Sequence, residues 1–144
     1  MFKLSLVVIM VGIFISLNVE AATCPAPAEV ACMKQRKCKV NAPGFTCSCV
    51  GSGHGVMKRF TRADWGSYPF GDLYPKHHVS CNYEAADSRT QVVVIHQTVQ
   101  PNLKKENFKG AWKYHGADDG MACGFGSVPC AMCNSSNVSS CPLP

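Results

Sequence analysis

The chain lacks the sequence features that identify membrane-spanning proteins, repeat proteins and the common classes of enzyme. After Leu17 no apolar run is long enough to cross a bilayer, and no segment repeats with a useful period. No Ser or Cys with a neighbouring base, and no pair of carboxylates, forms a recognisable catalytic motif. We therefore expect a protein without catalytic activity, although the enzyme class stays open because catalytic residues need not be neighbours in sequence.

Acidic residues are also scarce. The sequence holds 9 Asp and Glu against 14 Lys and Arg, which gives a formal net charge of +5. Most Lys and Arg residues stand in clusters, which are typical of a solvated surface. Such clusters also permit attraction to an anionic glycan or membrane. The sequence leaves the partner unknown; an extracellular protein and an anionic glycan are the candidates, and no nucleic acid is expected. The cations form three clusters: Lys34, Arg36, Lys37 and Lys39; Lys58, Arg59 and Arg62; Lys104, Lys105, Lys109 and Lys113.

The first 21 residues have the pattern of a secretory signal peptide. Lys3 precedes an apolar run over residues 4–17, and Val19 and Ala21 stand at the positions that a signal peptidase reads. The pattern predicts a leader over 1–21 and a mature domain over 22–144 that is secreted or periplasmic. No transmembrane segment is expected after cleavage.

All 10 cysteines lie in the predicted mature part. An even number at this density in an exported chain indicates a disulfide framework, because a small core gains stability from covalent links in an oxidising compartment. The sequence leaves the pairing open. The candidates for disulfide bonding are Cys24, Cys32, Cys38, Cys47, Cys49, Cys81, Cys123, Cys130, Cys133 and Cys141.

Alternating apolar residues predict a mainly β domain with a four- to five-stranded antiparallel sheet over 56–125. Residues 79–83 and 90–99 should form one hairpin with the second run in the centre of the sheet, and 111–115 should pair with 121–125. Residues 56–60 are a candidate fifth strand.

Two cysteine-bound segments should flank this sheet. The segment over 24–55 is expected to be rich in loops, with one or two helical turns within 29–37, and 126–144 to be a tail held by its cysteines. Trp65 and Trp112 are assigned to the core or its edge.

Two motifs offer candidate sites. Cys130 and Cys133 have the spacing of a thiol–disulfide centre, but no helical pattern follows them, so two separate structural bridges are the favoured interpretation. Together with Cys47 and Cys49 they could imitate a zinc site, although oxidation is expected instead, and no metal or cofactor is predicted. The aromatic loop over 65–74 is a candidate binding loop or a cover of the core, through Trp65, Tyr68, Phe70 and Tyr74.

The first five cysteines, from Cys24 to Cys49, have a spacing that resembles an epidermal-growth-factor-like module, with Gly44 and Phe45 before Cys47. The sixth cysteine of such a module is missing, since the next one is Cys81. This resemblance is therefore a misleading guide to the fold.

Over most of its mature length the chain is similar to small secreted cysteine-rich bacterial proteins classified only as a domain of unknown function. The resemblance implies a compact β-rich fold and no established activity. Extra cysteines at Cys32, Cys38, Cys47 and Cys49 depart from that pattern. The matching motifs are Cys24-Pro25, residues 42–45, Trp65 before Cys81-Asn82-Tyr83, and Trp112 before Cys123 and Cys130.

The sequence thus favours a secreted, non-catalytic binding protein built on a disulfide-stabilised scaffold. One alternative is an exported thiol–disulfide oxidoreductase that uses Cys130 and Cys133. A second alternative is an inhibitor or effector-like protein.

Overall fold

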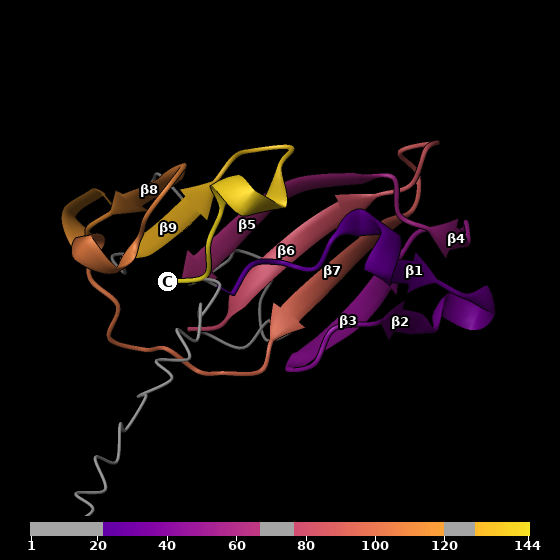
Figure 1. Cartoon of the computed structure of the whole chain (residues 1–144), viewed down its shortest axis with the longest axis horizontal. Helices are drawn as coiled ribbons and strands as arrows, with labels where there is room; N and C mark the ends of the chain where they lie inside the picture. Colours follow the sequence, from indigo (N-terminus) through magenta and orange to yellow (C-terminus); the bar gives the residue numbers. More distant parts are fainter. Residues whose placement is uncertain (1–21, 67–76, 120–128) are drawn as a thin grey trace, which may run out of the picture.

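A computed structural model describes residues 22–66, 77–119 and 129–144, and the predicted leader over 1–21 lies outside these ranges. The described residues form two antiparallel sheets, one of three strands in the order β2-β1-β4 and one of six in the order β3-β7-β6-β5-β9-β8 (Figure 1). The prediction of a mainly β, disulfide-rich fold is confirmed. The strands are β1 (Val30–Cys32), β2 (Cys38–Val40), β3 (Phe45–Val50), β4 (Gly55–Val56), β5 (Arg59–Gly66), β6 (Val79–Glu84), β7 (Gln91–His96), β8 (Trp112–His115) and β9 (Cys130–Cys133).

Helical structure in the described ranges is limited to short 3₁₀ turns. Two of them fall within the 29–37 region or at its edge, where the sequence predicted helical turns, and β1 separates them. No helix among the described residues is long and apolar enough to span a membrane. The turns are Pro27–Glu29, Lys34–Arg36, Lys105–Asn107, Ala117–Asp119 and Val138–Ser140.

The hairpin of β6 and β7 forms the middle of the larger sheet, as the sequence predicted. The two strands pair antiparallel from Ser80 opposite Ile95 to Glu84 opposite Gln91. β7 lies between β6 and β3, and its Val92 and Val94 have no exposed surface. β-Branched side chains favour such a central strand because they pack well on a pleated surface.

The larger sheet is wider than the four or five strands predicted, because both cysteine-bound segments contribute to it. β3 alternates Cys47 and Cys49 with the more exposed Thr46 and Ser48, so its cysteines serve as the apolar residues of a strand. β9 likewise forms between β5 and β8.

Of two further strand predictions, one falls only partly within the described residues and the other needs revision. Residues 112–115 form β8 and pair with β9, while the proposed partner 121–125 lies outside the described residues. The candidate strand 56–60 is divided between the two sheets: β4 ends at Val56 and β5 begins at Arg59. Met57, which separates them, is buried at 2% exposure, so the chain crosses from one sheet to the other through the core.

Three cysteines lie in one row across the larger sheet. Cys47 is opposite Val94, which is opposite Cys81 on its other side, and the row continues through Ala63 to Cys133. Residues in one register row of a pleated sheet present their side chains to the same face. This face of the sheet therefore carries sulfur atoms on β3, β6 and β9.

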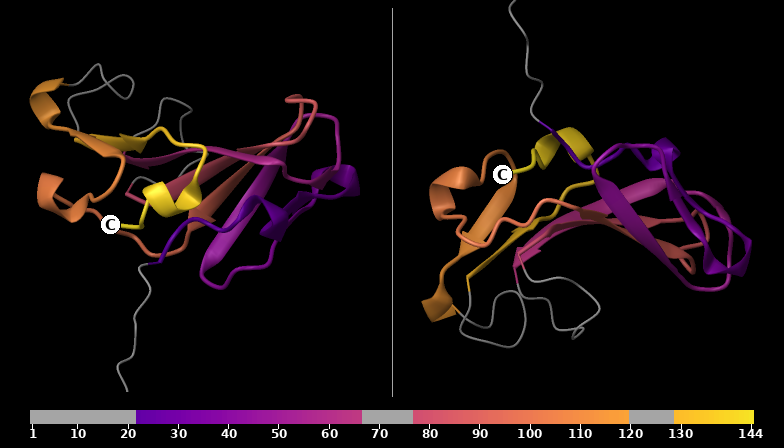
Figure 2. Two further views of the ribbon diagram at one scale, coloured as in Figure 1. Left: turned by 45° about the horizontal axis from the view of Figure 1, so that its top comes forward. Right: turned by 90° about the horizontal axis from the view of Figure 1, so that it is seen from below.

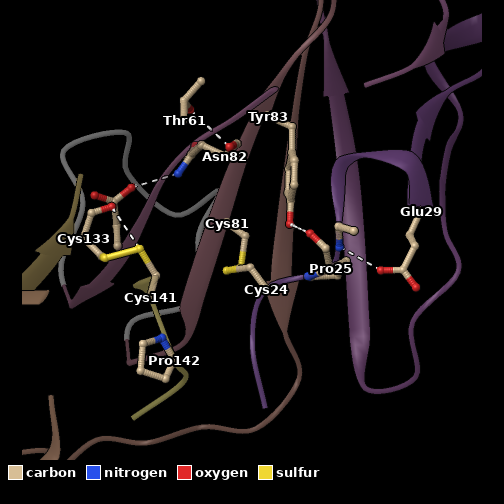
Figure 3. The surroundings of a disulfide bond; sticks show 12 residues. Cys24, Pro25, Glu29, Thr61, Cys81, Asn82, Tyr83, Cys133, Cys141 and Pro142 are labelled. Carbon is tan, nitrogen blue, oxygen red and sulfur yellow. Dashed lines mark hydrogen bonds between the residues drawn. A yellow bond between two sulfur atoms is a disulfide. The ribbon is translucent and has the colours of Figure 1, made fainter. Parts of the chain in front are cut away.

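Disulfides join that face to the segments that cover it. Cys81 bonds to Cys24 of the N-terminal segment, and Cys133 bonds to Cys141 of the C-terminal tail (Figure 3). Figure 2 shows the N-terminal segment and the C-terminal tail on the same side of the larger sheet. β3 bonds twice to the β1–β2 hairpin, through Cys38–Cys47 and Cys32–Cys49. Since Cys24 bonds to Cys81, the first five cysteines do not close among themselves as a growth-factor-like module.

Buried aromatic side chains of the same face donate hydrogen bonds to backbone carbonyls of the cover and, in the case of Trp65, of the connection between β7 and β8. The Tyr83 hydroxyl donates to the Pro25 carbonyl at 2.7 Å (Figure 3). The indole N–H of Trp112 donates to Pro142 at 2.8 Å, and that of Trp65 donates to Gln100 at 3.0 Å. Each polar atom thus finds a partner in the core, as burial of a Tyr or Trp requires.

The two disulfides of the cover differ in the loop they close but not in burial, which allows a direct comparison. Cys24 and Cys81 are separated by 57 residues and Cys133 and Cys141 by 8, and all four are at most 1% exposed. A disulfide stabilises the protein by constraining the unfolded chain, and a longer closed loop gives a larger effect. We therefore expect the double variant Cys24→Ala, Cys81→Ala to lose about 4 kcal/mol of unfolding free energy, and Cys133→Ala, Cys141→Ala to lose about 2.5 kcal/mol. Urea unfolding of both double variants measures this. Equal losses, or a larger loss for the shorter loop, would contradict the assignment.

Candidate functional site

The structure places the sequence-predicted binding residues unevenly. Trp65 lies in β5 and is buried at 2% exposure, with ring contacts to Phe108 and His77. Tyr68, Phe70 and Tyr74 lie outside the described residues. Of the aromatic loop, Trp65 therefore belongs to the core.

The two cysteines of the C-x-x-C motif stand in different bridges. Cys133 is bonded to Cys141. Cys130 is itself disulfide-bonded, and Cys123 lies outside the described residues. Cys47 and Cys49 are bonded to Cys38 and Cys32, so they supply no thiolates to a zinc site in this oxidised form.

Histidines and carboxylates are dispersed. His115 and Asp119 form an exposed pair at 2.7 Å within and beside the Ala117–Asp119 turn, and His78 contacts the His96 carbonyl at 2.7 Å. Within the described ranges, no three His, Cys, Asp or Glu side chains gather as metal ligands would. These groups do not assemble a recognisable catalytic centre there.

The turn of the β1–β2 hairpin is cationic and exposed. Residues 33–37 are all exposed, and they include Lys34, Arg36 and Lys37 of the first basic cluster. Gln35 and Arg36 have φ values of 62° and 57°, a left-handed conformation that costs side-chain-bearing residues roughly 1–2 kcal/mol each. The surrounding structure must therefore hold this turn in place.

Two hollows lie between this turn and the connection from β3 to β4. One has a volume of about 280 Å³ and lies between residues 33–36 and 51–54. The other has a volume of about 590 Å³ and extends along β1 toward β4. They share Met33, Lys34, Gln35 and His54. We call the two together the hairpin hollow; it is lined by residues 31–37 and 51–56.

Disulfides fix the first wall of the hairpin hollow. Cys32 and Cys38 face each other in the register of β1 and β2, immediately before and after the turn. Each is bonded to β3, at Cys49 and Cys47, with Cα–Cα distances of 5.7 and 5.8 Å. Both strands of the hairpin are thus bonded to β3 at the residues that flank the turn, which limits the motion of the turn.

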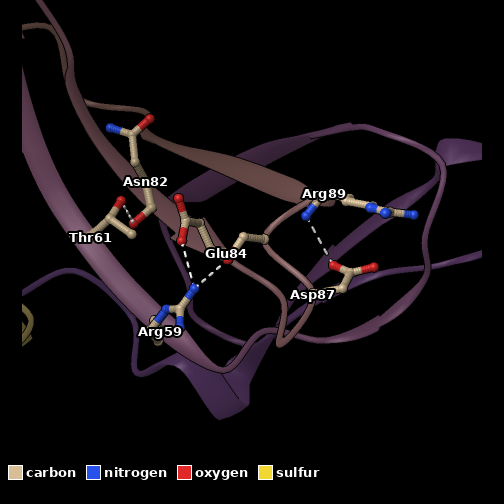
Figure 4. A network of polar contacts seen from close by, with 7 residues as sticks. Arg59, Thr61, Asn82, Glu84, Asp87 and Arg89 are labelled. Carbon is tan, nitrogen blue, oxygen red and sulfur yellow. Dashed lines mark hydrogen bonds and ion pairs between the residues drawn. The ribbon is translucent and has the colours of Figure 1, made fainter.

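Glycines fix the second wall. A Cβ at Gly53 would overlap the side chain of Thr90, and a Cβ at Gly51 would overlap the carbonyl of Arg89. The connection therefore packs closely onto the β6–β7 turn, and glycine is the residue that permits this approach. The turn itself is held by Arg59, which donates to Glu84 at 2.9 Å and to Ser88 at 2.6 Å, and by Asp87, which accepts from the Arg89 amide (Figure 4).

The charged residues that line the hairpin hollow are all cations, and the nearest acidic group given for its walls is Asp87, whose Oδ2 would lie 3.6 Å from a Cβ at Gly53. No Asp or Glu occurs between Glu29 and Asp64 in the sequence. Arg59 and Arg62 of the second basic cluster pair with Glu84 and Asp64. Within the described part of the chain, the first cluster (Lys34, Arg36, Lys37 and Lys39) makes no salt bridge.

The hairpin hollow could be predicted only in part. The basic cluster was visible in the sequence, but Met33, Gln35 and His54 were not distinguished from ordinary loop residues. The close spacing of Gly51, Gly53 and Gly55 was the available signal, because it indicates a connection that packs tightly or turns sharply.

Asp64 is a buried carboxyl on the opposite face of β5 from Ala63 and Trp65, and it is 6% exposed. Its Oδ2 accepts from Arg62 at 3.0 Å and from Asn82 at 2.9 Å. Among the described residues Oδ1 has no hydrogen-bond partner. Burial raises the pKa of Asp64, against the opposing effects of the Arg62 charge and the two hydrogen bonds.

Comparison of the chain with protein-family models, curated proteins and solved structures found no match. The resemblance to small secreted bacterial proteins of unknown function stays a prediction. The functional argument therefore depends on the geometry of the described residues.

Asp64 should make stability depend on pH. Because the pKa of Asp64 is raised in the folded state, the native protein binds this proton more tightly than the unfolded chain does. Protonation of Asp64 therefore adds to the free energy of unfolding in full below the unfolded pKa of 3.8, and this contribution is lost as pH rises through the folded pKa. The difference in unfolding free energy, wild type minus Asp64→Asn, should be larger at pH 4 than at pH 7 in urea titrations. An Asp118→Asn variant, in which the removed carboxyl is exposed, controls for net charge. A difference that grows with pH would contradict this.

Proposed function

We propose that this chain is a secreted, non-catalytic binding protein that contacts an anionic partner outside the cytoplasm through the hairpin hollow. The leader pattern over 1–21 supports secretion. The four described disulfide pairs are typical of an oxidising extracellular or periplasmic compartment.

The observation that carries the proposal is a set of cations on one fixed wall of the hairpin hollow, opposite a second fixed wall. Lys34, Arg36 and Lys37 are exposed, and no acidic residue lines the hollow beside them. Because disulfides hold one wall and close glycine packing holds the other, little conformational freedom is lost on binding. A rigid surface on which cations predominate attracts and orients an anionic partner.

The thiol–disulfide alternative is less well supported. In an enzyme of that class the two cysteines of the C-x-x-C motif bond to each other when oxidised, whereas here Cys133 bonds to Cys141. An inhibitor or effector would be a special case of the binding function, and no described feature favours it.

The proposal is tested by binding of oxidised mature protein, residues 22–144, to three immobilised polyanions: heparin, poly-L-glutamate and vesicles containing phosphatidylserine. Wild type should bind at least one of them. The triple variant Lys34→Gln, Arg36→Gln and Lys37→Gln should bind that probe at least about tenfold more weakly, because three counterion-releasing contacts are removed.

A matched control separates this site from net charge alone. Lys104→Gln, Lys105→Gln and Lys109→Gln remove the same charge from the segment beside β8, at the other end of the molecule from the β1–β2 hairpin (Figure 1). The control should retain binding within about twofold of wild type, since charges that distant are screened. Equal loss in both triples, or absence of binding by wild type to all three probes, would overturn the proposal.

A further inference from the structure

The lining of the hairpin hollow matches one class of polyanion better than others. We infer that its ligand is a linear sulfated glycan; this inference rests on the binding function proposed above and names the partner of that same site. The two hollows adjoin along the hairpin because they share Met33, Lys34, Gln35 and His54. A site extended in this way suits a chain rather than a compact anion.

Three kinds of group that a sulfated glycan requires are present together. Lys34, Arg36 and Lys37 supply cations for sulfate groups, and arginine also matches planar or multidentate oxyanions. Gln35, Ser52 and His54 supply hydrogen-bonding groups for hydroxyls. Met33 and Val56, each 51% exposed, offer apolar surface to the C–H faces of sugar rings.

A membrane surface fits these residues less well. Elements that bind the lipid interface combine cations with Trp, Phe or Leu. The residues that line the hairpin hollow include no Trp, Tyr, Phe or Leu. Two half-exposed aliphatic side chains bury too little apolar area to insert into a bilayer.

An acidic peptide also fits less well. Peptides that bind a sheet edge add a strand, which requires a row of free backbone groups. The sheet edge at the hollow is β4, which is only two residues long, Gly55–Val56. The hollow therefore recognises charge and ring surface rather than backbone.

The decisive experiment compares ligand chemistries by isothermal titration calorimetry on the oxidised mature protein. Heparin should bind at least about tenfold more tightly than chemically desulfated heparin of equal length, because the sulfates carry most of the counterion release. For heparin, the slope of log K against log salt concentration should decrease in magnitude by about 2 to 3 in the Lys34→Gln, Arg36→Gln, Lys37→Gln variant. The slope should be unchanged in the Lys104→Gln, Lys105→Gln, Lys109→Gln control.

A second variant tests the apolar part of the site. Met33→Ser with Val56→Ser should weaken heparin binding about threefold to tenfold while the salt slope stays that of wild type, since no charge is removed. Circular dichroism of each variant, compared with wild type, establishes that the sheets are intact. If this variant binds heparin with unchanged affinity, the inferred contact between sugar rings and the side chains of Met33 and Val56 is wrong.

The outcomes separate this inference from the broader function. If poly-L-glutamate or anionic vesicles bind as tightly as heparin and the hairpin triple variant abolishes that binding, the glycan inference is wrong and the binding function stands. Equal affinity for heparin and desulfated heparin also overturns the glycan inference. If no polyanion binds, both fail.

Discussion

The structure depends on disulfides that attach one face of the six-stranded sheet to the segments covering it. A chain of this size buries only a modest core. Among the described residues, no second large sheet packs on the face that carries Cys47, Cys81 and Cys133. The cover consists of the N-terminal segment, the β1–β2 hairpin and the C-terminal tail, which have little regular structure of their own. Covalent links compensate for the small number of backbone hydrogen bonds that such segments form with the sheet.

The candidate site follows from the same constraint. A hairpin whose strands are three residues long is marginal by itself, and its turn places Gln35 and Arg36 in left-handed conformations. Its two bonds to β3 keep it in place, so its cations extend from a rigid base. The opposite wall is positioned by backbone packing at Gly51 and Gly53. Specificity would then arise from fixed geometry rather than from ordering on binding.

The sequence predicts the parts of this protein that have a local signal. Alternation in residues 79–83 and 90–99 predicts the β6–β7 hairpin, and leader and cysteine count predict an oxidised, exported chain. The extent of the sheet escaped prediction because β3 alternates cysteines with Thr and Ser, and β9 consists of cysteines, Ala and Met. The strand character of such residues depends on burial against distant partners. The hairpin hollow was predicted only in part for the same reason: residues 33–37 and 51–56 are brought together by tertiary links, the pairing of β1 with β4 and the Cys32–Cys49 bond.

Disulfide mapping of the native mature protein tests the central claim most directly. Proteolysis without reduction, followed by mass spectrometry, should recover peptides that link Cys24 to Cys81, Cys32 to Cys49, Cys38 to Cys47 and Cys133 to Cys141. Recovery of a Cys130–Cys133 link, or of Cys24 bonded to another cysteine of the N-terminal segment, would contradict the account, because the cover would then not be bonded to the sheet.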